Sequence, residues 1–149
     1  MGMAQIHGSI DIRRPVEEVF DFLADQRNEP AYNNRMRTVE KATPGPIGQG
    51  TVWRVTTGPK RRQTSFELEV TEYSRPHRLF SVTRMGVADI RGGLTFRPSA
   101  EGTRMNWSWD FRPKGLLRLA TPIFTAVGRR QEQRNWAALK RHLERKAGR

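Results

Sequence analysis

The side chains that most often carry catalysis or bind metals are sparse in this sequence. It has no cysteine, which excludes disulfides, thiolate metal ligands and a cysteine nucleophile. The histidines, His7, His77 and His142, lie far apart along the chain, and none has metal-ligand spacing to another histidine or to a carboxylate. We therefore expect three surface histidines, no bound metal and no cofactor.

The carboxylates Glu67 and Glu69 form a pair that acid–base chemistry could use. Residues two apart lie on one face of a strand, and here that face is polar, so we expect both side chains to lie in water. The sequence patterns of the nucleophile elbow, the phosphate-binding loop and the dinucleotide-binding loop are absent. No catalytic residue is indicated, and whether the protein is an enzyme stays open.

Aromatic side chains give the stronger indication of a binding site. Trp53, Phe66, Phe96, Trp107 and Trp109 fall on the apolar faces of strand-like segments. Large aromatic rings supply most of the area that encloses an apolar ligand, but they also fill protein cores. Both roles are open for each of the five.

The first part of the chain predicts a strand followed by a helix. Residues 5–12 alternate between apolar and polar side chains, as a strand with one buried face does. Pro15 is suited to open a helix, and an apolar stripe with helical spacing continues to about Asp25. A second short helix or turn is expected around residues 29–33.

Alternating segments separated by short turns follow, which predicts an antiparallel sheet with one face in water. Strand 78–84 has an ambiguous alternation, because Phe80 and Val82 compete with Leu79 and Ser81 for the inner face. The expected strands are residues 36–42, 51–57, 63–73, 78–84, 87–97 and 103–112.

Residues 115–146 have a helical pattern, and Pro122 is expected to divide a short first helix from the main one. Residues 128–135 supply two turns without a large apolar side chain. Two explanations stay open. This part of the helix spans the mouth of a cavity, or it extends past the sheet into solvent. If Leu139 faces inward, Gln131 and Asn135 lie on the inner side of the same helix.

Four stretches carry a family resemblance: residues 15–25 with the later Tyr32-Asn33, residues 48–51, residues 102–107, and residues 135–144. The chain resembles the START-like (helix-grip, SRPBCC) superfamily, in particular its polyketide cyclase/dehydrase and lipid-transport branch. The resemblance implies an α+β helix-grip fold, with residues 1–149 forming a single START-like domain. A curved antiparallel sheet of about seven strands would wrap around a long C-terminal helix, with one or two short helices after the first strand.

The resemblance also implies that a small, mostly apolar ligand, such as a lipid, a polyketide or another hydrophobic metabolite, binds between the sheet and the C-terminal helix. An alternative is a polyketide cyclase or dehydratase, with Tyr32 or Asn135 as a proton-handling or orienting group. The superfamily shares no catalytic motif, so no catalytic role is carried over. The candidate cavity-lining residues are Tyr32, Trp53, Phe66, Phe96, Trp107, Trp109, Val127, Gln131 and Asn135.

The charge distribution supports a second alternative. The formal net charge is +12, and residues 112–149 hold 11 of the 27 basic residues but 2 of the 15 acidic ones. Such a segment can attract RNA, a ribosome or an anionic membrane, although it can also be a solvated surface. The N-terminal residues lack a signal-peptide pattern, so the expected location is the cytoplasm. We expect a monomer or a homodimer.

Overall fold

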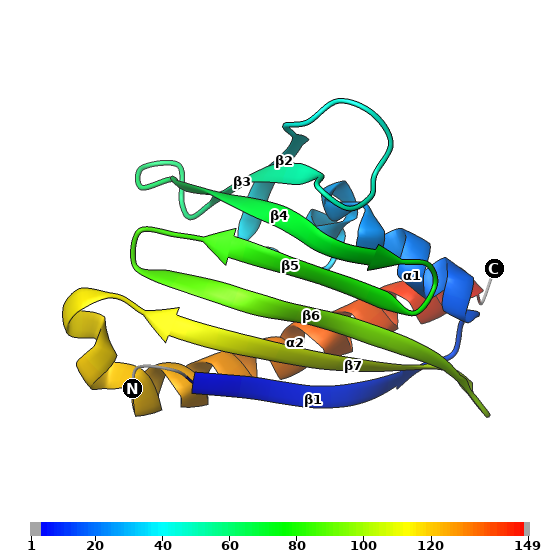
Figure 1. Cartoon of the computed structure of the whole chain (residues 1–149). Helices are drawn as coiled ribbons and strands as arrows, with labels where there is room; N and C mark the ends of the chain where they lie inside the picture. The colour runs from blue at the N-terminus through cyan, green and yellow to red at the C-terminus, as the bar shows by residue number, and fades with distance from the viewer. Residues whose placement is uncertain (1–3, 148–149) are drawn as a thin grey trace.

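The fold is an antiparallel sheet that curves around one long helix (Figure 1). The computed structural model describes residues 4–147. The strands lie in the order β1-β7-β6-β5-β4-β3-β2, so the first and last strands of the chain are neighbours. Their bounds are β1 Ala4–Ile12, β2 Met36–Lys41, β3 Val52–Thr57, β4 Thr64–Ser74, β5 Arg78–Arg84, β6 Ala88–Ser99 and β7 Gly102–Pro113.

Two short helices follow β1, as the sequence predicts. Helix α1 (Val16–Ala24) begins directly after Pro15 and buries Val16, Val19, Phe20 and Leu23. The 3-10 helix η1 (Gln26–Ala31) is capped by Asp25, whose carboxylate accepts a hydrogen bond from the backbone N–H of Arg27.

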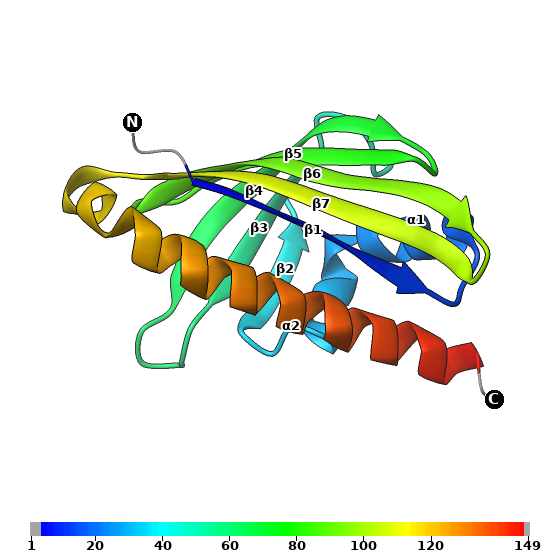
Figure 2. The same ribbon diagram turned by 90° about the horizontal axis from the view of Figure 1, so that it is seen from below.

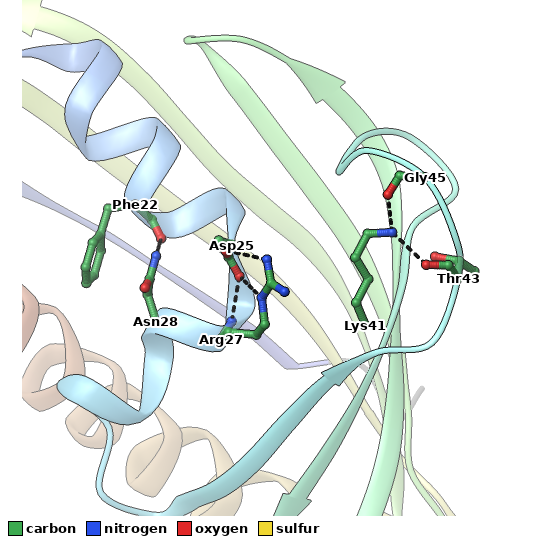
Figure 3. A network of polar contacts seen from close by, with 7 residues as sticks. All are labelled: Phe22, Asp25, Arg27, Asn28, Lys41, Thr43 and Gly45. Atoms are coloured by element: carbon green, nitrogen blue, oxygen red, sulfur yellow. Dashed lines mark hydrogen bonds and ion pairs between the residues drawn. The ribbon is translucent and has the colours of Figure 1, made fainter.

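Polar contacts fix η1 beside α1 (Figure 3). The Asn28 side-chain amide donates to the backbone oxygen of Phe22 at 2.9 Å, and the Arg27 guanidinium pairs with the Asp25 carboxylate at 2.8 Å. On the neighbouring loop, the Lys41 ammonium donates to the backbone oxygens of Thr43 and Gly45. The contacts of Asn28 and Asp25 hold η1 against the end of α1, just before Glu29 and Tyr32.

The C-terminal helix lies beneath the concave side of the sheet (Figure 2). A short 3-10 helix, η2 (Gly115–Ala120), precedes the main helix α2 (Thr121–Ala147). The division falls next to Pro122, as expected, because proline fits the first turn of a helix but not its interior. The expected helix-grip fold is confirmed.

The packed core lies at one end of this arrangement. Trp136, Leu139 and Leu143 of α2 are buried together with α1 and the inner faces of β1 and β7. Phe20 of α1 contacts Phe96 of β6 in an edge-to-face pair with ring centroids 5.4 Å apart. The second half of α2 therefore grips the sheet, and its first half lies outside this core.

Two glycines allow close approaches that shape the sheet. A Cβ atom on Gly8 of β1 would lie 2.4 Å from Trp107 Cζ2, so only glycine leaves room for that indole. Gly92 of β6 has φ +142°, and a Cβ atom there would lie 1.9 Å from the backbone oxygen of Ser108. At both positions, a larger side chain would collide with the neighbouring strand β7.

The ambiguous strand is resolved in the structure. Leu79, Ser81 and Thr83 of β5 line the space between the sheet and α2, and Phe80 also reaches it, whereas Val82 does not. The pairing of β4 with β5 shifts register between Val70 and Glu72. The extra residue lies on β4, so β5 itself alternates regularly. The pattern of residues 78–84 is ambiguous because both faces of β5 carry buried apolar side chains, with Leu79 7% and Val82 8% exposed.

Candidate ligand-binding cavity

A cavity of about 1090 Å³ lies between the concave sheet, η1 and the first half of α2. Its size is slightly above the range found for small-molecule sites, which is about 300–1,000 Å³. The sheet contributes mainly apolar side chains. These include Ile6, Phe66, Leu68, Val70, Leu79, Ile90, Leu94, Trp109 and Phe111.

The part of α2 without large apolar side chains covers this cavity. Gly128, Gln131, Glu132 and Asn135 all line it. A Cβ atom on Gly128 would lie 2.5 Å from Ile6 Cδ1, so the helix and β1 are in close contact at this point. Of the two explanations for the interrupted apolar stripe, the structure supports the one in which the helix spans a cavity.

A carboxylate from α2 marks a polar end of the cavity. Glu132 Oε2 accepts hydrogen bonds from Trp109 Nε1 at 3.0 Å and from Trp136 Nε1 at 2.7 Å. Burial raises the pKa of Glu132, while the two indole donors and the nearby Arg35 act in the opposite direction. The two tryptophans therefore hold this carboxylate at a fixed place in the cavity wall.

A second carboxylate comes from η1. Burial raises the pKa of Glu29 to about 7, and the charge of Glu132 adds to this rise. Asn33 Nδ2 donates a hydrogen bond to Glu29 Oε1 at 3.1 Å, which acts in the opposite direction. Burial, with smaller contributions from Glu29 and Glu132, raises the pKa of the Tyr32 phenol well above its ordinary value. Tyr32 is therefore a neutral hydrogen-bond donor at physiological pH.

The candidate residues from the sequence divide into two groups. Tyr32, Phe66, Trp109, Val127, Gln131 and Asn135 line the cavity. Trp53, Phe96 and Trp107 lie in the packed core instead, at 0%, 3% and 6% exposure.

Each of these three core positions has its own packing partner. Phe96 packs against Phe20, and Trp107 lies against Trp136 with ring centroids 6.0 Å apart. Trp53 is covered by the guanidinium of Arg27, 5.7 Å from the ring centroid. All three have the expected inward orientation, but helices already occupy or close off the space in front of them.

Sequence reasoning missed the two cavity glutamates and Arg35. Glu29 and Glu132 lie in polar segments, where a carboxylate normally reaches water. The sequence did contain one signal that Glu132 faces the sheet. Glu132 lies four residues after Gly128 and four before Trp136, so helical spacing places it on the face that turns toward the sheet.

The histidines and the Glu67/Glu69 pair do not contribute to this site. His7 and His77 are exposed, and the ring of His142 lies beside Phe22 with centroids 5.4 Å apart. Glu67 and Glu69 form surface ion pairs with Arg54 and Arg84. Within residues 4–147, no group of three or more His, Cys, Asp or Glu side chains is placed to hold a metal ion.

The fold and cavity define a helix-grip protein with a ligand-sized interior space. The sequence matches the model of the family described as polyketide cyclase/dehydrase and lipid transport over residues 3–144, and the chain belongs to that family. Its members include polyketide cyclases and proteins that bind hydrophobic ligands. No curated protein matches the sequence significantly.

Solved structures share the fold at low sequence identity. A START superfamily protein from Mycobacterium smegmatis has a TM-score of 0.80 at 12% identity, covering 95% of this chain and 97% of that one. The ZhuI aromatase/cyclase from Streptomyces sp. R1128 has a TM-score of 0.79 at 17% identity, covering 97% and 96%. Ara h 8.0201 has a TM-score of 0.72 at 14% identity, covering 91% and 95%. Among the described residues, no helix is long and apolar enough to cross a membrane.

Proposed function

We propose that this protein binds a small, mostly apolar molecule in the cavity between the sheet and α2, as a carrier or a sensor. The observation that carries the proposal is the cavity itself, about 1090 Å³ in volume and walled mainly by apolar side chains. Filling an apolar space of this size is favourable, because its wall atoms acquire dispersion contacts and apolar surface leaves water.

The site also has the balance of groups typical of ligand pockets. Apolar side chains form most of the wall, and polar groups such as Tyr32, Asn135 and Glu132 are set among them. Such an arrangement lets shape and burial supply affinity while the polar groups fix orientation.

Native mass spectrometry of freshly purified protein, compared with the same sample after organic extraction, tests the proposal. We expect an extra mass that disappears on extraction. The extracted protein should then bind the neutral apolar fluorophore N-phenyl-1-naphthylamine and melt at a higher temperature in its presence. A bare mass together with no binding of this fluorophore would count against a ligand-binding function.

A catalytic role is the alternative, supported by Tyr32 and Asn135 both lining the cavity. A neutral phenol can donate a hydrogen bond to a substrate carbonyl, whereas its raised pKa leaves almost no phenolate to act as a base at neutral pH. Tyr32 would therefore orient a polyketide-like substrate while the cavity enforces its folding. If a Tyr32→Phe/Asn135→Ala variant keeps full turnover, neither residue has the role in catalysis described above.

A second function has a separate observation in its favour. The large apolar side chains of Leu116, Leu119, Ile123 and Val127 on η2 and α2 are 86%, 85%, 68% and 61% exposed. Val87, 54% exposed, is near them, because the backbone N–H of Lys114 donates to the oxygen of Val87 at 2.9 Å. Such a cluster of exposed apolar side chains is typical of an interaction surface.

The charge near this apolar cluster favours an anionic membrane as its partner. Arg129, Arg130 and Arg134 of α2 are exposed next to it in sequence. Apolar side chains combined with basic ones suit insertion among acidic lipid headgroups. Val127 belongs to both the cluster and the cavity lining, so the membrane surface would lie beside the binding site.

Sedimentation with phosphatidylcholine vesicles, with or without phosphatidylserine, tests the membrane role. We expect binding to the phosphatidylserine vesicles that weakens as ionic strength rises. A Leu119→Ser/Ile123→Ser variant should lose it, and an Arg129→Gln/Arg130→Gln variant should weaken it. No vesicle binding, self-association through the apolar cluster, or preferential binding of single-stranded RNA would each exclude the membrane as partner.

A further inference from the structure

Two carboxylates occupy the polar end of a cavity that is otherwise mainly apolar. Glu29 comes from η1 and Glu132 from α2, and both line the space. Each one contributes to the electrostatic environment of Tyr32, and Glu132 also acts on Glu29. The two acidic groups therefore belong to one site rather than to separate surface positions.

The hydrogen bonds inside the protein leave part of each carboxylate unused. Both indole donors to Glu132 reach the same oxygen, Oε2, and Asn33 donates to Oε1 of Glu29. Among the described residues, no donor reaches Glu132 Oε1 or Glu29 Oε2. A carboxylate has about four acceptor positions, so this end of the cavity can accept several more hydrogen bonds.

The charges at this end are also unbalanced. Arg35, an exposed residue that lines the cavity, is the cation that acts on both Glu29 and Glu132. Tyr32 is neutral, and Asn33, Gln131 and Asn135 carry no charge. Arg37 also lines the cavity, but its guanidinium donates to the backbone oxygen of Gly58 and acts on neither carboxylate. With both carboxylates ionised, the group formed by Glu29, Glu132 and Arg35 therefore has one negative charge in excess.

We propose that the ligand of this cavity carries a cationic nitrogen, such as a protonated amine, that binds between Glu29 and Glu132 while its apolar body fills the rest of the space. Such a group donates charge-assisted hydrogen bonds to the free carboxylate oxygens and supplies the missing positive charge. The inference rests on the proposed ligand-binding function and narrows it to apolar amines.

The protonation of the site fits this assignment. The pKa of Glu29, about 7, means that this group gains or loses its proton near neutral pH. A bound cation favours the ionised carboxylate, so binding should release a proton and strengthen as the pH rises past 7. The other charged or titratable groups facing the pair are Tyr32 from the end of η1 and Arg35 before β2. The raised pKa of Tyr32 keeps its phenol protonated in this range.

A matched set of fluorescent anthracenes tests the proposal on the extracted full-length protein. 9-Anthracenemethylamine is cationic, 9-anthracenemethanol is neutral and 9-anthracenecarboxylate is anionic, but all three share one apolar body. We expect the amine to bind at least about tenfold more tightly than the alcohol at pH 7.5, and the carboxylate to bind most weakly. The preference for the amine should shrink at about pH 5.5, where Glu29 is protonated.

Isosteric variants assign the preference to the two glutamates. A Glu29→Gln/Glu132→Gln variant keeps acceptors for Asn33 and the two indoles but removes both charges, so amine and alcohol should bind it about equally. Glu67→Gln, an exposed position on β4, is the control and should keep the preference. Equal binding of amine and alcohol to the unmodified protein, or a preference that survives in the double variant, would overturn the proposal.

The outcomes separate this inference from the broader function. If the alcohol binds as well as the amine, the cavity binds ligands but the charge assignment is wrong. If neither the anthracenes nor N-phenyl-1-naphthylamine binds, the ligand-binding function fails, and the amine preference fails with it. If the double variant does not fold, the pH series on the unmodified protein still tests whether the preference for the amine depends on the charge of Glu29.

Discussion

At the scale of single residues, Glu29 couples the cavity to the stability of the fold. Its pKa in the folded protein, about 7, lies above the ordinary value of 4.5. Between these two values the folded state binds more protons than the unfolded state, so this residue makes folding less favourable as pH rises through that window. Below 4.5 both states are protonated, and the contribution of Glu29 is fully favourable there.

The Glu29→Gln variant should therefore stabilise the protein at pH 8 but have little effect at pH 4.5. The difference is on the order of 2–3 kcal/mol in the free energy of unfolding, from the size of the pKa rise. Thermal melts of both proteins at the two pH values measure it, with Glu67→Gln as the exposed control. An equal effect of Glu29→Gln at both values would contradict the burial of this carboxylate.

Gly8 gives a second prediction at this scale, for packing. Gly8→Ala should destabilise the protein by about 1–3 kcal/mol, because the new methyl group would collide with the Trp107 indole inside a packed core. Gly48→Ala is the matched control, since no atom lies within 4 Å of a Cβ atom there. Urea denaturation gives both values. Similar midpoints for the two variants would mean that Trp107 can move away without cost.

At the scale of elements, helix α2 has two parts with different roles. Its second half is part of the core, where Leu139 has 0% exposure, and its first half covers the cavity, where Val127 is 61% exposed. A stripe of apolar side chains is therefore needed only in the second half. This division explains how one helix can hold the fold together and still leave space beneath it.

The two halves should respond differently to truncation of a side chain. Leu139→Ala should cost about 2–5 kcal/mol of unfolding free energy, because it leaves a void in the core. Val127→Ala should stay within about 0.5 kcal/mol, because most of this side chain is already in water. Chemical denaturation of the two variants tests the division. A large loss for Val127→Ala would show that the first half also holds the fold.

The same elements show how far the sequence predicts the fold. Regular alternation located the strands, and Pro122 located the start of α2, because these signals are local. The inner face of β5 could not be assigned, because apolar side chains are buried on both faces of this strand, Leu79 on one and Val82 on the other. For Trp53, Phe96 and Trp107, alternation gave the correct face of the sheet. It did not show that helices pack directly against that face.

At the scale of the whole molecule, the cavity exists because distant segments surround it without filling it. The polar end joins Glu29, which follows the first helix, to Glu132 near the other end of the chain. Each glutamate lies in a sequence segment typical of a solvent-exposed charge, so the sequence did not indicate that the two side chains line the same cavity. Burial and mutual repulsion, which raise the pKa of Glu29, arise only when the fold encloses both.

The cavity can be filled by a side chain as well as by a ligand. Ser81 of β5 lines the space, so Ser81→Trp should place an indole in it and leave the thermal stability unchanged or higher. The variant should lose the rise in melting temperature caused by N-phenyl-1-naphthylamine. For the unmodified protein, a probe concentration 100 times its dissociation constant should add about 2.7 kcal/mol of stability.

Ser108→Trp is the control for this experiment, because Ser108 is exposed on β7. It adds the same side chain outside the cavity and should keep the full response to the probe. If Ser81→Trp is folded and still responds like the unmodified protein, the probe binds elsewhere. The exposed apolar cluster on η2 and α2 would then be the place to look for it, and Leu119→Ser/Ile123→Ser should abolish the response.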